Sequence, residues 1–124
     1  MGAALWVVQA LVALIFAGHG YTLLFTLDRM RDRPRSAWTR AVSDQLLRSI
    51  GVLEVLAAIG LIVPVLTGVL PWLTVLAATS LVVLMVLAIA FHLRRGEWPN
   101  IALNAILLAL ATFIAYGRLV IVPV

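Results

Sequence analysis

Long apolar stretches, separated by short polar ones, dominate the hydropathy pattern of this chain. Four of them stand apart, at about residues 3–27, 46–66, 72–93 and 100–116. Each is long enough to cross a hydrocarbon core of about 30 Å as an α-helix that rises about 1.5 Å per residue. Membrane-spanning β-strands would alternate polar and apolar residues, and these stretches do not. The pattern therefore predicts an all-α fold, a membrane-spanning antiparallel four-helix bundle.

Proline, glycine and charged residues at the ends of these stretches set the expected helix limits. Pro71 and Pro99 lie where a helix would begin, and Gly96 lies where one would end. Near the start of the second helix, Asp44 and Arg48 are spaced to form an (i, i+4) ion pair. We expect one transmembrane domain over residues 1–124, with helices at about 3–27, 36–66, 71–95 and 99–118.

The arginine residues are distributed unevenly between the loops. The loop after the first helix carries Arg29, Arg31, Arg33, Arg35 and Arg40, and the loop after the third carries Arg94 and Arg95. The loop between the second and third helices has none, and Arg118 is the one basic residue on the opposite side. Because positively charged loops stay in the cytoplasm, we expect both termini outside. The sequence thus indicates a multi-pass protein of the bacterial inner (plasma) membrane.

Composition supports a chain that is surrounded by lipid. Hydrophobic residues make up 65% of the 124 positions and charged residues only 11%, whereas a soluble domain has about 25% charged residues. The chain has no cysteine, which excludes disulfides and thiolate catalysis. Its net charge of +4 comes from arginines at the ends of apolar stretches, where they meet lipid headgroups. We therefore expect the lipid bilayer, and no nucleic acid, as a partner.

Glu54 and His19 are ionisable residues inside apolar stretches. A carboxyl group near the middle of the membrane costs about 2.5–3.5 kcal/mol on insertion scales, so it should be protonated or paired inside the bundle. Each residue lies about eight positions, or roughly 12 Å, from the cytoplasmic end of its helix. On antiparallel helices these depths match, and small residues such as Gly51 and Gly20 would allow close packing. We expect Glu54 and His19 within hydrogen-bonding reach, as a candidate acid/base pair.

Four further polar side chains should lie in the same inner half of the bundle. The candidate ligand-binding residues are Thr22, His92, Asn100 and Asn104. Interhelical packing is the alternative role for the two asparagines, and a place among the lipid headgroups is the alternative for His92. The expected depths of the two histidines differ by roughly two helical turns, so we expect no metal site.

Two segments resemble a known family. Residues 47–54, LRSIGVLE, are similar to the second-helix signature of the DoxX-like membrane proteins, with its Gly-x-x-Glu core. Residues 91–100, FHLRRGEWPN, followed by Asn104 and the ending Tyr116-Gly117-Arg118, resemble the turn between the third and fourth helices of that family. The resemblance implies a four-helix membrane fold with an interior Glu54. It also implies a connection to quinones or lipids, because one relative is a membrane subunit of a thiosulfate:quinone oxidoreductase.

Three functions remain open on these observations. The first is a non-catalytic subunit or accessory protein that binds a quinone, a lipid or another apolar small molecule in the bundle, since ligand pockets combine apolar walls with a few polar groups. The second is a small membrane enzyme, an isomerase or cyclase, in which Glu54 and His19 act as acid and base. The third is a proton-coupled transporter. A redox or biosynthetic partner protein and a homo-oligomer are compatible with each, and no cofactor is required, although a quinone is possible.

Labelling of single cysteines tests the topology, because the natural chain has none. We expect a cysteine at Arg33 to react with a membrane-impermeant maleimide only after the inner face is exposed. A cysteine at Leu70, in the loop without arginines, should react from the outside of intact cells. Labelling of position 33 from outside would contradict the predicted orientation.

Overall fold

The four apolar stretches form four long helices in the computed structural model, which describes all 124 residues. They are α1 (Gly2–Phe25), α3 (Asp44–Thr67), α4 (Leu73–Arg95) and α5 (Trp98–Tyr116), the last extended by a π-helical turn, η2 (Gly117–Ile121). All four are long and apolar enough to cross a membrane. The structure confirms the predicted all-α four-helix bundle, and the protein is a multi-pass membrane protein.

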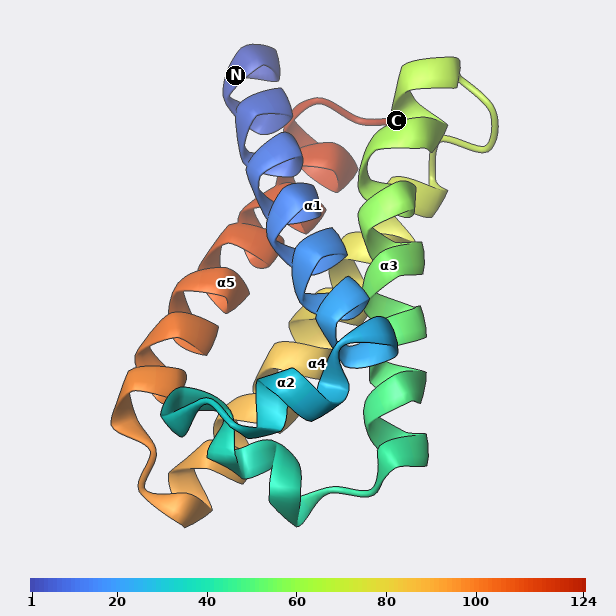
Figure 1. Cartoon of the computed structure of the whole chain (residues 1–124). Helices are drawn as coiled ribbons and strands as arrows, with labels where there is room; N and C mark the ends of the chain where they lie inside the picture. Colours follow the sequence, from blue (N-terminus) through green and yellow to red (C-terminus); the bar gives the residue numbers. More distant parts are fainter.

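Both termini lie at one end of the bundle, and two of the three connections lie at the other (Figure 1). Helix α1 packs along α3, α3 along α4, and α4 along α5, as expected for consecutive antiparallel helices. The contact between α1 and α5 is much smaller. These two helices lie near each other at the end with the termini and move apart toward the other end (Figure 1). Below, the end without the termini is called the inner end, following the predicted orientation.

The packing surface and the lipid-facing surface differ in side-chain size rather than in polarity. Large apolar side chains point outward all around the bundle; Leu14 and Phe25, for example, are 74% and 71% exposed. Small residues fill much of the centre, where helices packed in lipid approach one another closely. The central cluster consists of Val12, Ala13, Phe16, Ala57, Ala58, Leu61, Ala77, Ala78, Leu81, Met85, Leu107, Ala111 and Ile114.

Helices α1 and α3 approach each other closely where they cross, at Gly20 and Gly51. A Cβ atom added to Gly20 would lie 2.8 Å from the Gly51 carbonyl oxygen, and one added to Gly51 would lie 3.0 Å from the Gly20 oxygen. Only glycine lets two backbones come this close. The small residues expected around Glu54 therefore do form a tight helix crossing.

A proline inside α3 is accommodated by a contact with α4. Pro64 has no N–H group, so the carbonyl of Gly60, four residues earlier, lacks its helical donor. The Thr74 hydroxyl, which is fully buried, donates a hydrogen bond of 2.8 Å to this carbonyl. An unpaired carbonyl would cost several kcal/mol in lipid, so this bond allows the helix to continue past the proline.

The second long helix begins later than the sequence predicts. The expected start near residue 36 is replaced by two short helices, α2 (Leu27–Arg31) and the 3-10 helix η1 (Pro34–Ala41), which cross the inner end of the bundle (Figure 1). Ser43 then caps α3, because its hydroxyl oxygen accepts a hydrogen bond of 3.2 Å from the Leu46 N–H.

One arginine joins these three segments. The Arg31 guanidinium of α2 donates to the carbonyl of Val42, after η1, at 3.2 Å, and it forms an ion pair with Asp44 of α3 at 2.5 Å. The predicted pair between Asp44 and Arg48 is therefore wrong. Asp44 is instead bound by Arg31, so this ion pair joins α2 to the start of α3.

Two alanine substitutions on one turn of α1 test the helix crossing. Replacement of glycine by alanine inside a helix normally stabilises it by about 1 kcal/mol. Gly18→Ala should show this gain, because a Cβ atom there meets nothing within 4 Å. Gly20→Ala should instead destabilise the protein, by about 1–3 kcal/mol, because it forces two backbones apart. Thermal unfolding in detergent measures both, and an equal rise in stability for the two variants would contradict the tight crossing.

Candidate functional site

A cavity of about 360 Å³ lies at the inner end of the bundle, between α1 and α5 and above η1. Helices α1 and α5, which supply part of its lining, are farther apart at this end than at the end with the termini (Figure 1). Its lining combines charged, polar and apolar groups, as ligand sites commonly do. The residues around it are Gly18, His19, Thr22, Met30, Arg33, Arg35, Ser36, Trp38, Pro99, Asn100 and Leu103.

His19 presents its imidazole to this cavity, and Glu54 holds the ring from behind. The two side chains meet at 2.7 Å, between His19 Nδ1 and Glu54 Oε2. Glu54 is buried on α3, whereas the His19 side chain remains 38% exposed. The contact confirms the predicted geometry and follows from the crossing at Gly20 and Gly51, which brings the helices together beside both residues. With Nδ1 engaged, Nε2 is the ring atom that remains for a bound molecule.

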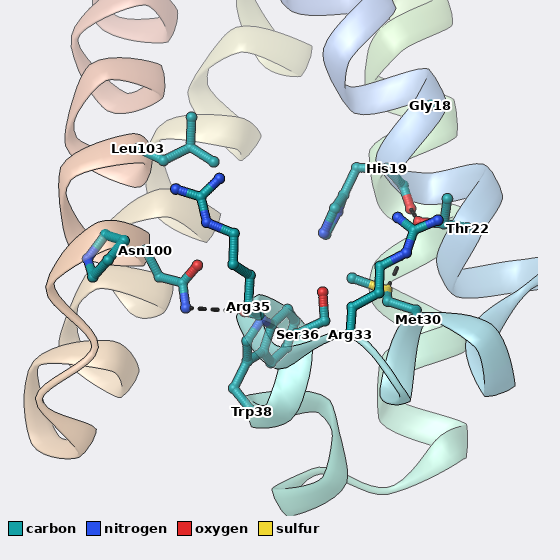
Figure 2. Close-up of a pocket in the computed structure, with 11 residues that line it drawn as sticks. Gly18, His19, Thr22, Met30, Arg33, Arg35, Ser36, Trp38, Asn100 and Leu103 are labelled. Carbon is teal, nitrogen blue, oxygen red and sulfur yellow. Dashed lines mark hydrogen bonds between the residues drawn. The ribbon is translucent and has the colours of Figure 1, made fainter.

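Thr22 and Asn100 also line the cavity, from opposite sides. The Thr22 hydroxyl donates to the backbone oxygen of His19 at 2.7 Å, so its own oxygen remains available as an acceptor. The Asn100 amide on α5 donates to the backbone oxygen of Arg35 at 3.4 Å, which links α5 to η1 (Figure 2). Three of the predicted site residues, His19, Thr22 and Asn100, are thus brought to one cavity.

His92 and Asn104 are not part of the cavity wall. His92 is buried behind Trp38, with the two rings edge to face and their centroids 5.3 Å apart. His92 Nδ1 lies 2.9 Å from Glu97 Oε1, so the two histidines form separate pairs with different carboxyl groups. Asn104 is half-buried one helical turn above Asn100. A role in ligand binding for either residue stays a prediction.

Glu97 links His92 to the turn between α4 and α5. Burial raises the pKa of Glu97, but hydrogen bonds and charges from His92 and Arg95 lower it more, so its pKa lies below the usual value. Arg95 Nε donates to the same Glu97 oxygen at 2.9 Å. An ionised Glu97 therefore holds His92 against Trp38, and Trp38 in turn forms part of the cavity wall.

Arg33 and Arg35 are site residues that the sequence reading missed. The sequence predicted only that the arginine-rich loop orients the protein in the membrane and contacts lipid headgroups. In the structure, both side chains rise from the floor toward the bundle, Arg33 beside α1 and Arg35 beside α5 (Figure 2). Pro34 lies between them and restricts Arg33 to extended backbone (φ −80°, ψ 134°), where the chain turns into η1. The spacing of Arg33, Pro34 and Arg35 is the only local feature of the sequence that could have indicated these two site residues.

A second polar cluster lies in the outer half of the bundle. Arg118 is buried, and its Nε donates to Gln9 Oε1 at 2.7 Å; Gln9 Nε2 in turn donates to the Leu61 carbonyl at 2.5 Å. The guanidinium also lies over the Trp6 ring, 5.3 Å from its centroid. Arg118 Nη2 is buried without a hydrogen-bond partner. Arg118 therefore acts inside the bundle, although its place after the fourth apolar stretch is typical of an interfacial arginine.

An apolar layer separates the two clusters. Along α1, Gln9 and His19 are ten residues apart, or roughly 15 Å. Between them, Val12, Ala13 and Phe16 belong to the central apolar cluster. The inner cavity and the outer arginine are thus separate features of the bundle.

Comparison with known proteins identifies one family. A model described as the DoxX-like family matches residues 7–114, from the first turns of α1 to the last turn of α5. No curated protein and no solved structure matches the chain. The match covers the whole cavity and the pair of His19 and Glu54, and it ends before Arg118.

A pair of substitutions in the outer cluster tests the buried arginine. Gln9→Leu leaves the buried Arg118 guanidinium without this hydrogen bond, which should cost about 1.5–3 kcal/mol of unfolding free energy. The double variant Gln9→Leu with Arg118→Met removes the charge as well, so it should be more stable than Gln9→Leu alone. Chemical unfolding in detergent, with Arg118→Met as the other single variant, measures the coupling. If the stability lost in the double variant equals the sum of the losses in the two single variants, the two side chains do not depend on each other.

Proposed function

The chain belongs to the DoxX-like family of membrane proteins, and we propose that it binds an amphipathic small molecule of the bilayer, a quinone or a lipid, in the inner cavity. It would do so as a subunit or accessory of a membrane process. The observation that carries the proposal is the polar cavity between α1 and α5. A bundle that served only as scaffold would gain nothing from hydratable groups at this depth, since each is costly unless it has a partner.

The size of the cavity and its groups suit the polar head of such a molecule. Its volume of about 360 Å³ lies within the range of about 300–1,000 Å³ that is usual for ligand sites. His19 Nε2 and the Asn100 amide can each hydrogen-bond to a carbonyl or hydroxyl oxygen. Met30 and Leu103 supply apolar contact beside them.

Access from the lipid is the second support for the proposal. Gly18 and Leu103 line the cavity from α1 and α5, and both residues are exposed. Gly18 has no side chain to close the gap between these helices. An apolar tail could therefore remain among the lipids while the head occupies the cavity.

The oriented histidine favours a second candidate function, a membrane-embedded isomerase or cyclase. A carboxylate that fixes the tautomer and orientation of an imidazole is the usual arrangement of a general base, and His19 Nε2 faces the cavity. In this alternative Glu54 and His19 would move a proton to or from the bound molecule. A proton-coupled transporter would also need a polar route to the outer side, and the central apolar cluster lies across that route.

Fluorescence of Trp38 tests binding, because this side chain is part of the cavity wall. In a variant whose other three tryptophans are phenylalanine, we expect decylubiquinone to quench Trp38 saturably in nanodiscs. A matched variant that retains only Trp72, near the outer loop, should show non-saturable collisional quenching alone. Gly18→Leu, which fills the lateral gap, should abolish the saturable part. Identical quenching curves for Trp38 and Trp72 would rule out quinone binding at this cavity.

Glu54→Gln then separates binding from proton transfer. Glutamine keeps the shape and most hydrogen bonds of the carboxyl group, but it cannot exchange a proton. A binding protein should show unchanged quenching of Trp38 in this variant. For the enzyme alternative, a lipid extract is incubated with either protein and its components are followed by mass spectrometry. Conversion of a component by the natural protein but not by Glu54→Gln would favour the enzyme.

A further inference from the structure

We propose that the natural ligand of the inner cavity is an acidic amphiphile, a molecule with an apolar tail whose head carries a carboxylate or a phosphate. The inference rests on the proposed binding function and specifies the charge of the ligand. Two arginines, Arg33 and Arg35, line the cavity. The pairing of His19 with Glu54 does not require them, and neither does binding of a neutral molecule.

The charges around the cavity are unbalanced. Arg33 and Arg35 contribute two positive charges, and no aspartate or glutamate is among the lining residues. Neither guanidinium forms an ion pair or a hydrogen bond within the protein, unlike Arg31, Arg95 and Arg118, which are all engaged. The free guanidinium groups are therefore available to a ligand.

The pair of His19 and Glu54 cannot reverse this balance. An ion pair and a neutral pair both contribute no net charge, and a neutral imidazole beside a carboxylate contributes only one negative charge. With two arginines among its lining residues, the cavity has a net positive charge in each of these states. Glu54 is also buried behind the His19 ring, so the ring and not the carboxylate meets the ligand.

The arginines are arranged to hold one head between them. Figure 2 shows the Arg33 and Arg35 side chains on opposite sides of the cavity, with the His19 imidazole directed into the space between. Hydrogen bonds from guanidinium to carboxylate or phosphate are stronger than those between neutral groups. The backbone that carries Arg35 is held by Asn100 of α5. An anionic head would thus meet donors from α1, η1 and α5.

The dimensions favour a single head with a tail over a larger polar molecule. A volume of about 360 Å³ lies near the lower limit of about 300 Å³ that is usual for ligand sites. The cavity therefore holds the head and the first few carbons, and the remaining chain lies between α1 and α5 in the lipid.

Binding of matched lipids tests the charge of the head. Purified protein in nanodiscs of neutral phosphatidylcholine is titrated with tritiated palmitate and tritiated hexadecanol, and empty nanodiscs give the background. At alkaline pH, where palmitate is ionised, we expect it to bind at least about tenfold more tightly than the alcohol, the effect of one charge-assisted contact. Hexadecyl phosphate, in the same assay, shows whether the carboxylate or the phosphate is preferred.

Substitutions of single arginines locate the interaction. Arg33→Gln and Arg35→Gln should each weaken palmitate binding about tenfold and weaken hexadecanol binding much less. Neither removes an internal contact of the side chain, and circular dichroism verifies folding. Arg29→Gln is the matched control, because it removes one charge from the same loop outside this cavity. Arg33→Lys, which keeps the charge, should retain part of the affinity.

The outcomes separate this inference from the proposed function. Equal affinity for hexadecanol and the two acids would overturn the inference and leave binding of amphiphiles intact. An equal loss of affinity in Arg29→Gln would also overturn it, because the effect would then come from the overall charge of the loop. Absence of binding by all three lipids, together with unsaturable quenching of Trp38, would overturn both.

Discussion

Contact between the backbones of α1 and α3 at Gly20 and Gly51 is the constraint on which the inner half of this protein depends. It places His19 and Glu54 at hydrogen-bonding distance without a water between them, and so lets both polar groups stay at membrane depth. It also draws α1 toward α3 while α4 holds α5. Helices α1 and α5 are consequently apart at the inner end, and the cavity lies between them (Figure 1).

Elsewhere in the bundle, several buried polar groups are paired with a group of another helix. The carbonyl freed by Pro64 accepts the Thr74 hydroxyl, and the Leu61 carbonyl accepts the Gln9 amide. Arg118 relies on Gln9 and the Trp6 ring, with one nitrogen left unpaired. Apolar packing alone would allow several rotations of the helices relative to one another. Because lipid offers no alternative hydrogen bonds, these contacts select one of them.

The inner cavity differs from this arrangement, because several of its polar groups have no partner in the protein. The two free guanidinium groups, the second nitrogen of His19 and the acceptor oxygen of Thr22 are all directed to one space. The floor that presents them is held by Arg31, which binds α2, η1 and α3 together. The unpaired groups and the contacts of Arg31 support the proposal that this cavity is a binding site.

Much of this protein is determined by its sequence alone. The four spans, their antiparallel order, the family resemblance and the matched depth of His19 and Glu54 all follow from hydropathy, short motifs and helix rise. These properties can be read from short segments of the chain, and the bilayer strictly limits the length and hydropathy of each span. Only the tertiary structure decided that residues 34–41 form a separate helix under the bundle, that Arg33 and Arg35 line the cavity, and that Arg118 binds Gln9, 109 positions away in sequence. Arginine side chains are long and rotatable, so their partners depend on which helices lie within reach, and hydropathy carries no information about that.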